Sequence, residues 1–351
     1  MKAAFYVYPT AFQSPGGGEV MLLKTREYLE REGVEVSLFD PWRDKLKDFD
    51  LLHTFGSVKD ALPMMRAASQ AGIPNVLSTV CWYSWKSAWG TYGTLRNRVL
   101  SAARHAAKSW LPFLPSERKT MMEISDILLP NSQSEARQLM RFFRMPESKI
   151  LVVPNAVDSS FAEASPELFV ERYGFQDFIL LVGRIEPRKN QLNVIRALKG
   201  IGRPTVIIGD CVPGYETYES ACRQEADRDI HFLGGLPHGS PLLASAYAAC
   251  DTFVLGTWLE TPGLAALEAA LAGAKVVITE EGATREYFKN FVRYVPPSDP
   301  RAIREAVQKS LASSKGPALS IHIKENYSWA NTAKLTLSAY RKVLSAKEIE
   351  S

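Results

Sequence analysis

The sequence predicts an α/β protein built from two domains, each with a parallel sheet. Short apolar stretches typical of buried strands alternate with amphipathic stretches typical of helices, which is the pattern of a parallel sheet covered on both faces. The alternation restarts after a polar stretch over residues 159–176 that contains serine and proline. A length of 351 residues is enough for two domains that each bury a core.

Composition and charge argue against several classes of protein, among them disordered, nucleic-acid-binding and membrane-spanning proteins. Hydrophobic residues make up 46% of the chain and charged residues 23%, which is usual for a folded globular protein and argues against disorder. The net charge of +4 is too small and too dispersed to indicate a nucleic-acid partner. The four cysteines follow no C-x-x-C spacing, so we expect neither a metal site nor a disulfide framework. The compartment that we expect for this protein is a reducing cytoplasm. No apolar stretch approaches the length of about 18 residues that spans a bilayer, and residues 1–9 lack the core of a signal peptide.

The first half begins with a glycine-rich βαβ unit. A strand over about residues 3–8 leads into Gly16 and Gly17, an amphipathic helix that stops at Gly33, and a strand over residues 34–39. Glycine has no Cβ atom, so backbone N–H groups can approach an anion at the start of the helix, although a flexible turn would use glycine too. The third glycine of the dinucleotide fingerprint G-x-G-x-x-G is absent.

The alternation then continues through a strand over residues 50–55, a helix near residues 58–71, and strands over residues 73–80, 125–130 and 149–154. His53 falls near the carboxyl end of its strand, where ligands bind in parallel sheets. A single histidine is more often structural, and we favour that interpretation.

Residues 81–122 are rich in aromatic and basic side chains. A basic amphipathic helix with such aromatics can lie against a membrane surface or bind an acceptor. An ordinary helix on the domain surface is the interpretation that we favour.

The second half repeats the strand and helix pattern, with strands expected over residues 178–182, 205–208, 230–233, 252–255 and 275–279. Between the first of these strands and a helix that ends at Leu198 lie three cations, Arg184, Arg188 and Lys189. Cations between a strand and the following helix are typical of a site that binds a polyanion. The alternative is that these side chains are ordinary charged residues on the surface, exposed to solvent.

Two glutamates flank the start of another expected helix. Thr261 can cap a helix that begins at Pro262 and stops at Gly273, which places Glu260 in the loop before it and Glu268 about two turns inside. The N–H groups at the helix start favour an anion, so this segment can hold a phosphorylated sugar with its hydroxyls on the two carboxylates. Glutamates at this spacing also occur by chance elsewhere in the chain.

Taken together, the order and spacing of these motifs resemble those of the retaining glycosyltransferases of family 4, which have the GT-B architecture of two Rossmann-like domains facing each other across a cleft. The matching motifs cover nearly the whole chain and are Gly16-Gly17-x-Glu19, Val153-Pro154-Asn155-Ala156-Val157-Asp158, Val182-Gly183-Arg184 with Lys189, Gly209-Asp210, Phe232-Leu233-Gly234, and the Glu260/Glu268 pair with Ala269 and Gly273.

The resemblance implies three domains: an acceptor-side domain over residues 1–158, a domain that binds the nucleotide sugar over residues 159–326, and a C-terminal helix over residues 327–351 that packs back on the first. It implies that a sugar moves from a UDP-, GDP- or ADP-sugar to a glycan or lipid-linked acceptor with retention of the anomeric configuration. No metal or other cofactor and no nucleic acid are expected. The enzyme would be cytoplasmic, with possible peripheral contact with a membrane.

The resemblance also implies roles for matching residues. Arg184 and Lys189 would hold the donor diphosphate and stabilise it as it leaves, with Gly16 and Gly17 closing over it from the other domain. Glu260 would contact the transferred sugar and is counted with Arg184 and Lys189 as catalytic. The remaining substrate-binding residues are those that offer N–H groups to the phosphates, Gly263 and Leu264, and the one that accepts hydrogen bonds from the ribose, Glu268.

Two departures from the family pattern keep other functions open. Many relatives carry Gly-Phe where this chain has Thr261-Pro262, and a histidine near the reacting centre where it has Cys81, Trp82 and Tyr83. The alternatives are a sugar-nucleotide epimerase or phosphorylase of the same architecture, and a degenerate protein that binds the donor without turnover.

Overall fold

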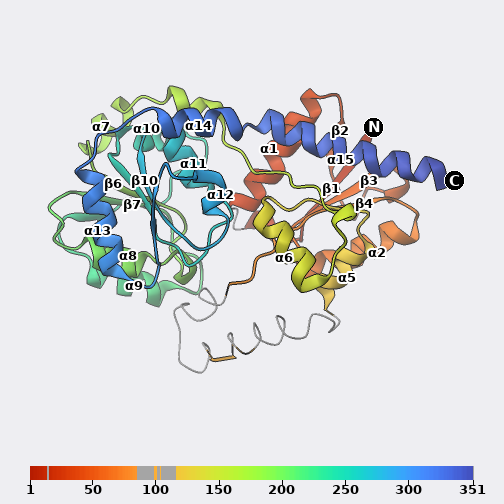
Figure 1. Ribbon diagram of the computed structural model, residues 1–351, viewed down its shortest axis with the longest axis horizontal. Helices are drawn as coiled ribbons and strands as arrows, with labels where there is room; N and C mark the ends of the chain where they lie inside the picture. Colours follow the sequence, from red (N-terminus) through yellow and green to blue (C-terminus); the bar gives the residue numbers. More distant parts are fainter. Residues whose placement is uncertain (14–15, 85–98, 101–102, 104–115, 351) are drawn as a thin grey trace. The chain divides into compact units, whose positions relative to one another are not determined.

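The computed structural model describes the chain except for residues 14–15, 85–98, 101–102, 104–115 and 351 (Figure 1). Most of the aromatic and basic stretch over residues 81–122 therefore lies outside the described residues. The described residues form two compact units. The first comprises the described residues within Met1–Tyr83, Ala106–Ala156 and Tyr327–Ser351, and the second comprises those within Ser84–His105 and Val157–Asn326.

The first unit has a five-stranded sheet in which all pairs are parallel, in the order β2-β1-β3-β4-β5. Its strands are β1 (Lys2–Tyr6), β2 (Glu35–Leu38), β3 (Leu51–Phe55), β4 (Asn75–Ser78) and β5 (Ile127–Leu128). Its helices are α1 (Gly17–Arg31), α2 (Leu62–Gln70), α5 (Glu117–Ile124), α6 (Gln133–Phe143) and α15 (Trp329–Glu350), with short 3-10 helices η1 (Ala11–Gln13), η2 (Leu46–Asp48), η3 (Lys59–Ala61) and η4 (Glu147–Lys149).

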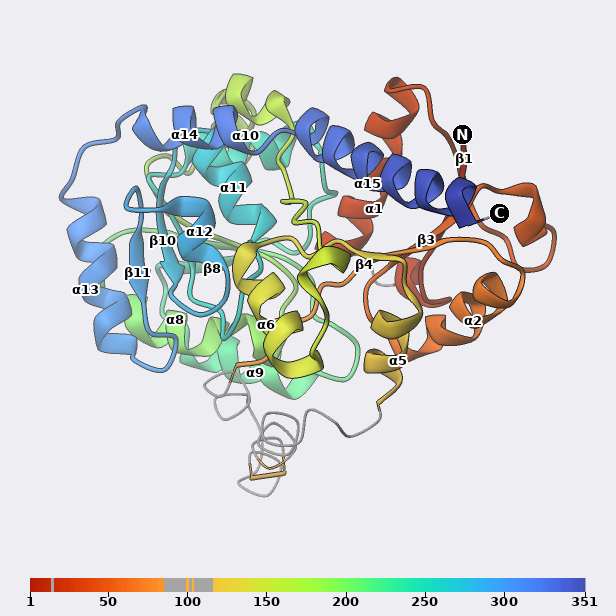
Figure 2. The ribbon, with the colours of Figure 1, turned by 45° about the vertical axis from the view of Figure 1, so that its right-hand side comes forward.

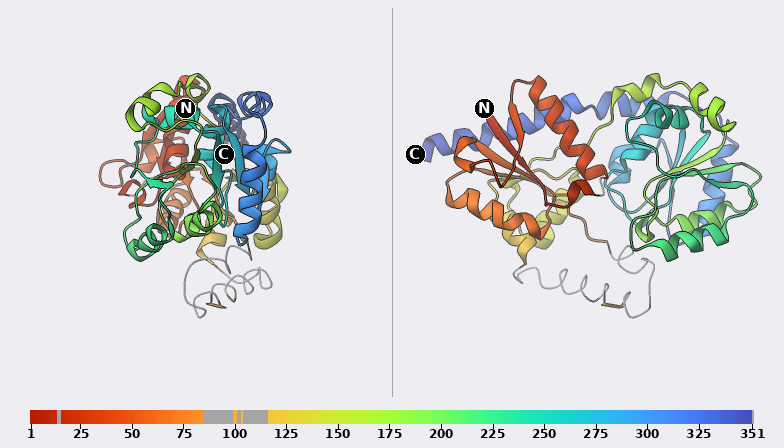
Figure 3. Two further views of the ribbon diagram at one scale, coloured as in Figure 1. Left: turned by 90° about the vertical axis from the view of Figure 1, so that its left-hand side faces the viewer. Right: turned by 180° about the vertical axis from the view of Figure 1, so that it is seen from behind.

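Both faces of this sheet are buried. Successive residues of a strand point to opposite faces, so neighbouring residues enter different cores. Ala3 and Phe5 of β1 belong to the core beneath α1 and α15, together with Leu22 of α1. Ala4 belongs to the opposite core, which α2, α5 and α6 cover. The two helix layers can be followed from behind in Figure 3. This arrangement explains why the strands are apolar throughout rather than at alternate positions.

The strand expected over residues 149–154 is wrong: within it, only Ile150 forms a bridge, to Leu128 of β5. Leu151 and Val153 donate to the carbonyls of Leu128 and Pro130, at 3.0 and 2.9 Å. Pro130 has no N–H with which to return a hydrogen bond, so a regular ladder cannot continue.

His53 has the structural role that we favoured. It lies in the middle of β3, its side chain is buried, and both ring nitrogens are bonded: Nδ1 to the Tyr340 hydroxyl at 2.6 Å and Nε2 to Ser78 Oγ at 2.9 Å. Burial lowers the pKa of His53 to about 3. The imidazole is therefore neutral at physiological pH and links β3 to β4 and α15.

The buried histidine predicts acid sensitivity. In the unfolded chain His53 takes up a proton as the pH falls below about 6.5, but in the folded chain only near its lowered pKa of about 3. Its contribution to the free energy of unfolding should thus be complete above about pH 6.5 and be lost on acidification, by up to about 1.4 kcal/mol per pH unit. Urea unfolding of the wild type and of His53→Gln at a series of pH values below about 6.5 measures this loss. If the free energy of unfolding of the two proteins fell in parallel with pH, the prediction would be contradicted.

The second unit has a six-stranded parallel sheet in the order β11-β10-β9-β6-β7-β8. Its strands are β6 (Ile179–Val182), β7 (Thr205–Ile208), β8 (Ile230–Phe232), β9 (Thr252–Leu255), β10 (Lys275–Thr279) and β11 (Arg293–Val295). Its α-helices are α7 (Glu167–Tyr173), α8 (Gln191–Leu198), α9 (Glu216–Glu225), α10 (Pro241–Ala249), α11 (Leu264–Leu271), α12 (Thr284–Phe288), α13 (Pro300–Leu311) and α14 (Ala318–Asn326), and its 3-10 helices are η5 (Ser159–Glu163) and η6 (Pro187–Lys189).

In this unit α8, α9 and α13 cover one face of the sheet, and α10, α11 and α14 the other (Figure 2). The five strands expected here are present, whereas β11 at the sheet edge was not expected. The fold class, α/β with two parallel sheets, is confirmed. No helix among the described residues combines the length and apolarity needed to cross a membrane.

Candidate functional site

The predicted site residues of the second unit lie where the order of its sheet reverses. From β6 the chain proceeds to β7 on one side of the sheet, and from β9 to β10 on the other, so the reversal falls between the neighbours β6 and β9. Ligands of open parallel sheets bind beyond the carboxyl ends of the strands at such a point. Arg184 and Lys189 follow β6, and Glu260 follows β9.

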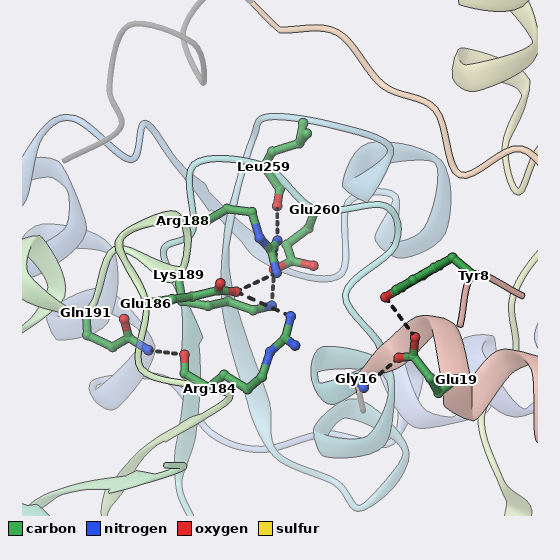
Figure 4. A network of polar contacts seen from close by, with 10 residues as sticks. All are labelled: Tyr8, Gly16, Glu19, Arg184, Glu186, Arg188, Lys189, Gln191, Leu259 and Glu260. Carbon is green, nitrogen blue, oxygen red and sulfur yellow. Dashed lines mark hydrogen bonds and ion pairs between the residues drawn. The ribbon is translucent and has the colours of Figure 1, made fainter. Parts of the chain in front are cut away.

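A nearly buried ion pair joins these two loops. Lys189 Nζ lies 2.7 Å from Glu260 Oε1, and the two side chains are 17% and 8% exposed (Figure 4). Arg188 Nη1 lies 4.0 Å from the same carboxylate oxygen, and its Nη2 donates to Glu186 at 3.0 Å. Cations from the loop after β6 thus surround a carboxylate from the loop after β9.

The environment keeps this carboxylate ionised. Burial by itself raises the pKa of Glu260, but Lys189 and Arg188 lower it by more, so the net shift is downward. Burial lowers the pKa of Lys189, opposed by Glu260. A buried pair of this kind is held by mutual attraction, so removing either member leaves an uncompensated charge.

Arg184 is a more accessible cation than Lys189. Its side chain is 39% exposed, and its Nη2 lies 3.6 Å from Glu186 Oε1. Its backbone carbonyl accepts a hydrogen bond from Gln191 Nε2 at 2.8 Å, which fixes the loop to the start of α8. Glu186 therefore contacts both arginines, a role that our sequence interpretation missed although its spacing, two residues from each arginine, could have suggested it.

A glycine fixes the backbone of Glu260. Glu260 forms a β-bridge with Gly282, and its carbonyl accepts from the Ala283 N–H at 3.0 Å. Gly282 has φ +107°, and a Cβ atom there would lie 1.9 Å from the Glu260 carbonyl oxygen. Only glycine allows this close approach.

The helix after Glu260 begins later than expected. Thr261 is not its cap and Pro262 is not its first residue, because Gly263 is in the left-handed region with φ +91° and is itself the N-cap of α11. The Gly263 carbonyl accepts from Ala266 and Leu267. Across the described ranges, the N–H groups of Gly263 and Leu264 have no protein acceptor, as expected of a helix start that can receive an anion.

Glu268 belongs to a second polar cluster in the same unit. Its side chain is 7% exposed, its Oε2 accepts from the Tyr247 hydroxyl at 2.8 Å, and its Oε1 lies 2.9 Å from His238 Nε2. Burial, reinforced by Glu268, raises the pKa of Tyr247 well above its usual value, so the phenol remains a donor. No local pattern indicates a role for Tyr247, which lies in the mostly apolar α10.

The glycine-rich loop lies in the first unit, again at a reversal of strand order, between β1 and β3. Gly16 is the N-cap of α1, and Gly17 is its first residue. Glu19 Oε2 accepts from the Gly16 N–H at 2.7 Å, and its Oε1 from the Tyr8 hydroxyl at 3.4 Å. This capping box holds the glycines at the carboxyl edge of the sheet.

Across the residues described here, no three His, Cys, Asp or Glu side chains are grouped so as to hold a metal ion.

Comparison with known proteins adds independent findings. The family model described as "Glycosyl transferases group 1" matches residues 170–328, and the model "Glycosyltransferase Family 4" matches residues 42–161. The chain is 24% identical to O-antigen chain mannosyltransferase B of Escherichia coli, over 69% of this chain and 68% of that protein. It is 22% identical to D-inositol 3-phosphate glycosyltransferase of Kineococcus radiotolerans, over 95% and 92%.

Solved structures agree in fold. Sucrose-phosphate synthase from Thermosynechococcus elongatus superposes with a TM-score of 0.75 at 16% identity, over 98% of this chain and 99% of that one. HepE from Anabaena, in complex with UDP and glucose, does so with a TM-score of 0.71 at 16% identity, over 97% and 99%.

Proposed function

The chain belongs to the family 4 glycosyltransferases of GT-B architecture, and from this we propose that it transfers a hexose from a nucleotide-diphosphate sugar to a glycan or lipid-linked acceptor with retention of the anomeric configuration. The observation that carries the proposal is the cation cluster at the strand reversal of the second unit. Lys189, Arg184 and the start of α11 all belong to loops at the carboxyl ends of β6 and β9.

Such a cluster suits the departure of a diphosphate. When the bond between the sugar and the diphosphate breaks, negative charge grows on the leaving phosphate oxygens. Cations and N–H groups already fixed in position stabilise this charge without reorganising. Lys189 is fixed by Glu260, and Arg184 is accessible to the ligand. Because these side chains supply the positive charge themselves, the proposal includes no metal or other cofactor.

The carboxylates would bind hydroxyl groups. Glu260 Oε1 is bonded to Lys189, and its other acceptor positions would accept from the transferred sugar. Glu268 is oriented by Tyr247 and His238, and its remaining lone pairs would accept from the ribose of the donor. Gly263 and Leu264 would offer N–H groups to the phosphates. Gly17 of the first unit would contribute its own, while Gly16, whose N–H donates to Glu19, would let the backbone come close to the ligand.

A UDP-sugar is the first donor to test, with GDP- and ADP-sugars next, because the structurally similar HepE was solved with UDP and with UDP-glucose. We further propose a cytoplasmic site of action with peripheral contact with a membrane. The support for that contact is the aromatic and basic composition of residues 81–122.

The direct test measures release of nucleoside diphosphate and the identity of the product. Arg184→Ala should lower donor turnover by about 10- to 100-fold, since a charge-assisted hydrogen bond is worth about 1.5–3 kcal/mol. Arg196→Ala, which removes an exposed arginine paired with Glu225, is the matched control and should leave turnover unchanged. Normal turnover by Arg184→Ala would reject the assignment, and a free sugar or sugar phosphate as product, in place of a glycoside, would indicate an epimerase or phosphorylase.

A further inference from the structure

We infer that Arg118 binds an oxyanion of the acceptor, a phosphate or a carboxylate, and so makes this a transferase for negatively charged acceptors. The inference rests on the proposed function and deepens it, because it names a chemical class for the acceptor. It concerns a residue of the first unit that is not among those assigned to the donor.

Arg118 lies at the carboxyl edge of the first sheet. It is the second residue of α5, and its guanidinium spans two loops: Nε donates to the Ser57 carbonyl at 3.2 Å, and Nη1 donates to the Tyr83 hydroxyl at 2.9 Å. Ser57 follows β3, and Tyr83 follows β4. Because the strand order of this unit reverses between β1 and β3, Arg118 is attached to one of the two loops that border the expected ligand position.

Both partners of Arg118 are held in place. The Ser57 N–H and hydroxyl both donate to the Thr79 carbonyl, at 3.0 and 2.7 Å. The Tyr83 N–H donates to Gln138 Oε1 at 2.7 Å, and Gln138 Nε2 donates back to the Tyr83 carbonyl at 3.1 Å. The guanidinium is therefore oriented before any ligand binds, which lowers the entropy cost of binding.

The charge of Arg118 has no counter-charge in the protein as described. None of the described carboxylates lies within ion-pair distance of this half-buried guanidinium, whose protein contacts are Ser57, Tyr83 and the neighbouring Cys81. The nearby buried carboxylate, Glu135, instead accepts from the Cys81 N–H and the Thr79 hydroxyl, both at 2.5 Å. A partly desolvated cation without a carboxylate partner is costly, and an anionic ligand would offset that cost.

The protonation state and the geometry both favour an oxyanion. Burial alone lowers the pKa of Arg118, but Cys81 and Tyr83 raise it by more, so the guanidinium stays charged. A guanidinium has five N–H groups; Ser57 and Tyr83 accept from two of them, and the Cys81 side chain is a further partner. Those that remain form the planar fork that phosphate and carboxylate accept in pairs.

The first test observes Arg118 directly. Its Nε–H is hydrogen-bonded and partly buried, so it should give a slowly exchanging resonance in protein labelled with 15N-arginine, identified by its absence in Arg118→Lys. Titration with inorganic phosphate and, separately, with acetate should move this resonance in a saturable way. A response to phosphate alone assigns a phosphate ligand, and a response to acetate alone assigns a carboxylate. A resonance that neither anion moves would overturn the inference.

The second test separates binding from a merely structural role. Glucose and inositol are compared with their phosphate esters, and glucose with glucuronate, as acceptors for nucleoside diphosphate release. We expect Arg118→Gln to raise the KM for the charged acceptors by about 10- to 100-fold, the loss of a charge-assisted pair, while kcat with uncharged acceptors and the donor KM stay unchanged. Arg66→Gln, an exposed arginine of α2, is the matched control. Equal losses with charged and uncharged acceptors would show a structural role and overturn the inference.

The two proposals fail in different ways. If no nucleotide sugar raises the melting temperature and none is turned over, the donor assignment fails, whereas the Arg118 resonance still reports whether an anion binds. If the donor binds and turns over but phosphate and acetate leave the Arg118 resonance unmoved, only the acceptor inference fails.

Discussion

Replacing Lys189 by methionine should lower the rate of sugar transfer by about 10²–10³-fold, the loss measured when one fixed donor to a developing oxyanion is removed from other enzymes. Lys189 is the least exposed of the three cations in the loop after β6, and its Nζ lies 2.7 Å from the Glu260 carboxylate. Methionine keeps much of the volume and removes the charge. Release of nucleoside diphosphate under saturating donor measures the effect, and transfer within threefold of wild type by a folded variant would contradict it.

The same substitution should also destabilise the second unit. It leaves Glu260 nearly buried with Arg188 Nη1 4.0 Å away, and breaking a buried pair costs about 3–5 kcal/mol. The double variant Lys189→Met/Glu260→Gln should regain most of that stability, which would attribute the loss of stability to the unpaired Glu260 carboxylate. Lys199→Met, an exposed lysine paired with Glu225 at 3.2 Å, is the matched control for both measurements.

Glu268→Gln should weaken donor binding by about 10- to 100-fold, because hydrogen bonds to a charged acceptor are worth about 1.5–3 kcal/mol and glutamine carries no charge. The Tyr247 hydroxyl and His238 orient this carboxylate, so its geometry is set before the ribose arrives. Calorimetric titration with the donor nucleotide measures the affinity.

Two further variants serve as comparisons for Glu268→Gln. Glu305→Gln removes an exposed carboxylate of α13 in the same unit and should leave affinity unchanged. Tyr247→Phe keeps the charge of Glu268 but removes one of its donors, so its affinity should fall between wild type and Glu268→Gln. Wild-type affinity in Glu268→Gln would show that the carboxylate does not contact the donor.

Most strands of the two sheets could be predicted because they are short apolar stretches buried on two faces. The edge strand β11, which begins with the exposed Arg293, could not. The segment over residues 149–154 misled the prediction, since it looks like a strand in sequence but lies beside Pro130, which has no N–H to complete the ladder. The start of α11 was placed two residues early, because Thr-Pro is a common helix start and the left-handed conformation of Gly263 is set by the surrounding fold.

Some residues of the candidate site could also be predicted from the sequence, and others could not. Arg184, Lys189 and Glu260 could be proposed from motif order, because each follows a strand end at a fixed spacing. The partners of Glu268 could not, since Tyr247 lies 21 residues away and His238 lies 30 residues away in another loop. Arg118 was missed for the same reason: its contacts, Ser57 and Tyr83, lie 61 and 35 residues away. Pairings of this range depend on how the helices pack, which local patterns do not encode.

The return of α15 to the first unit has a consequence for biosynthesis. One side of the first sheet is covered by Trp329, Ala333 and Tyr340, so this half of the hydrophobic core is incomplete until the last helix leaves the ribosome. At translation rates of about 5–20 residues per second, the β1–β4 segment waits on the order of tens of seconds for it. The nascent N-terminal segment must therefore be shielded from aggregation during that interval, while the second unit, most of which lies between Val157 and Asn326, can fold first.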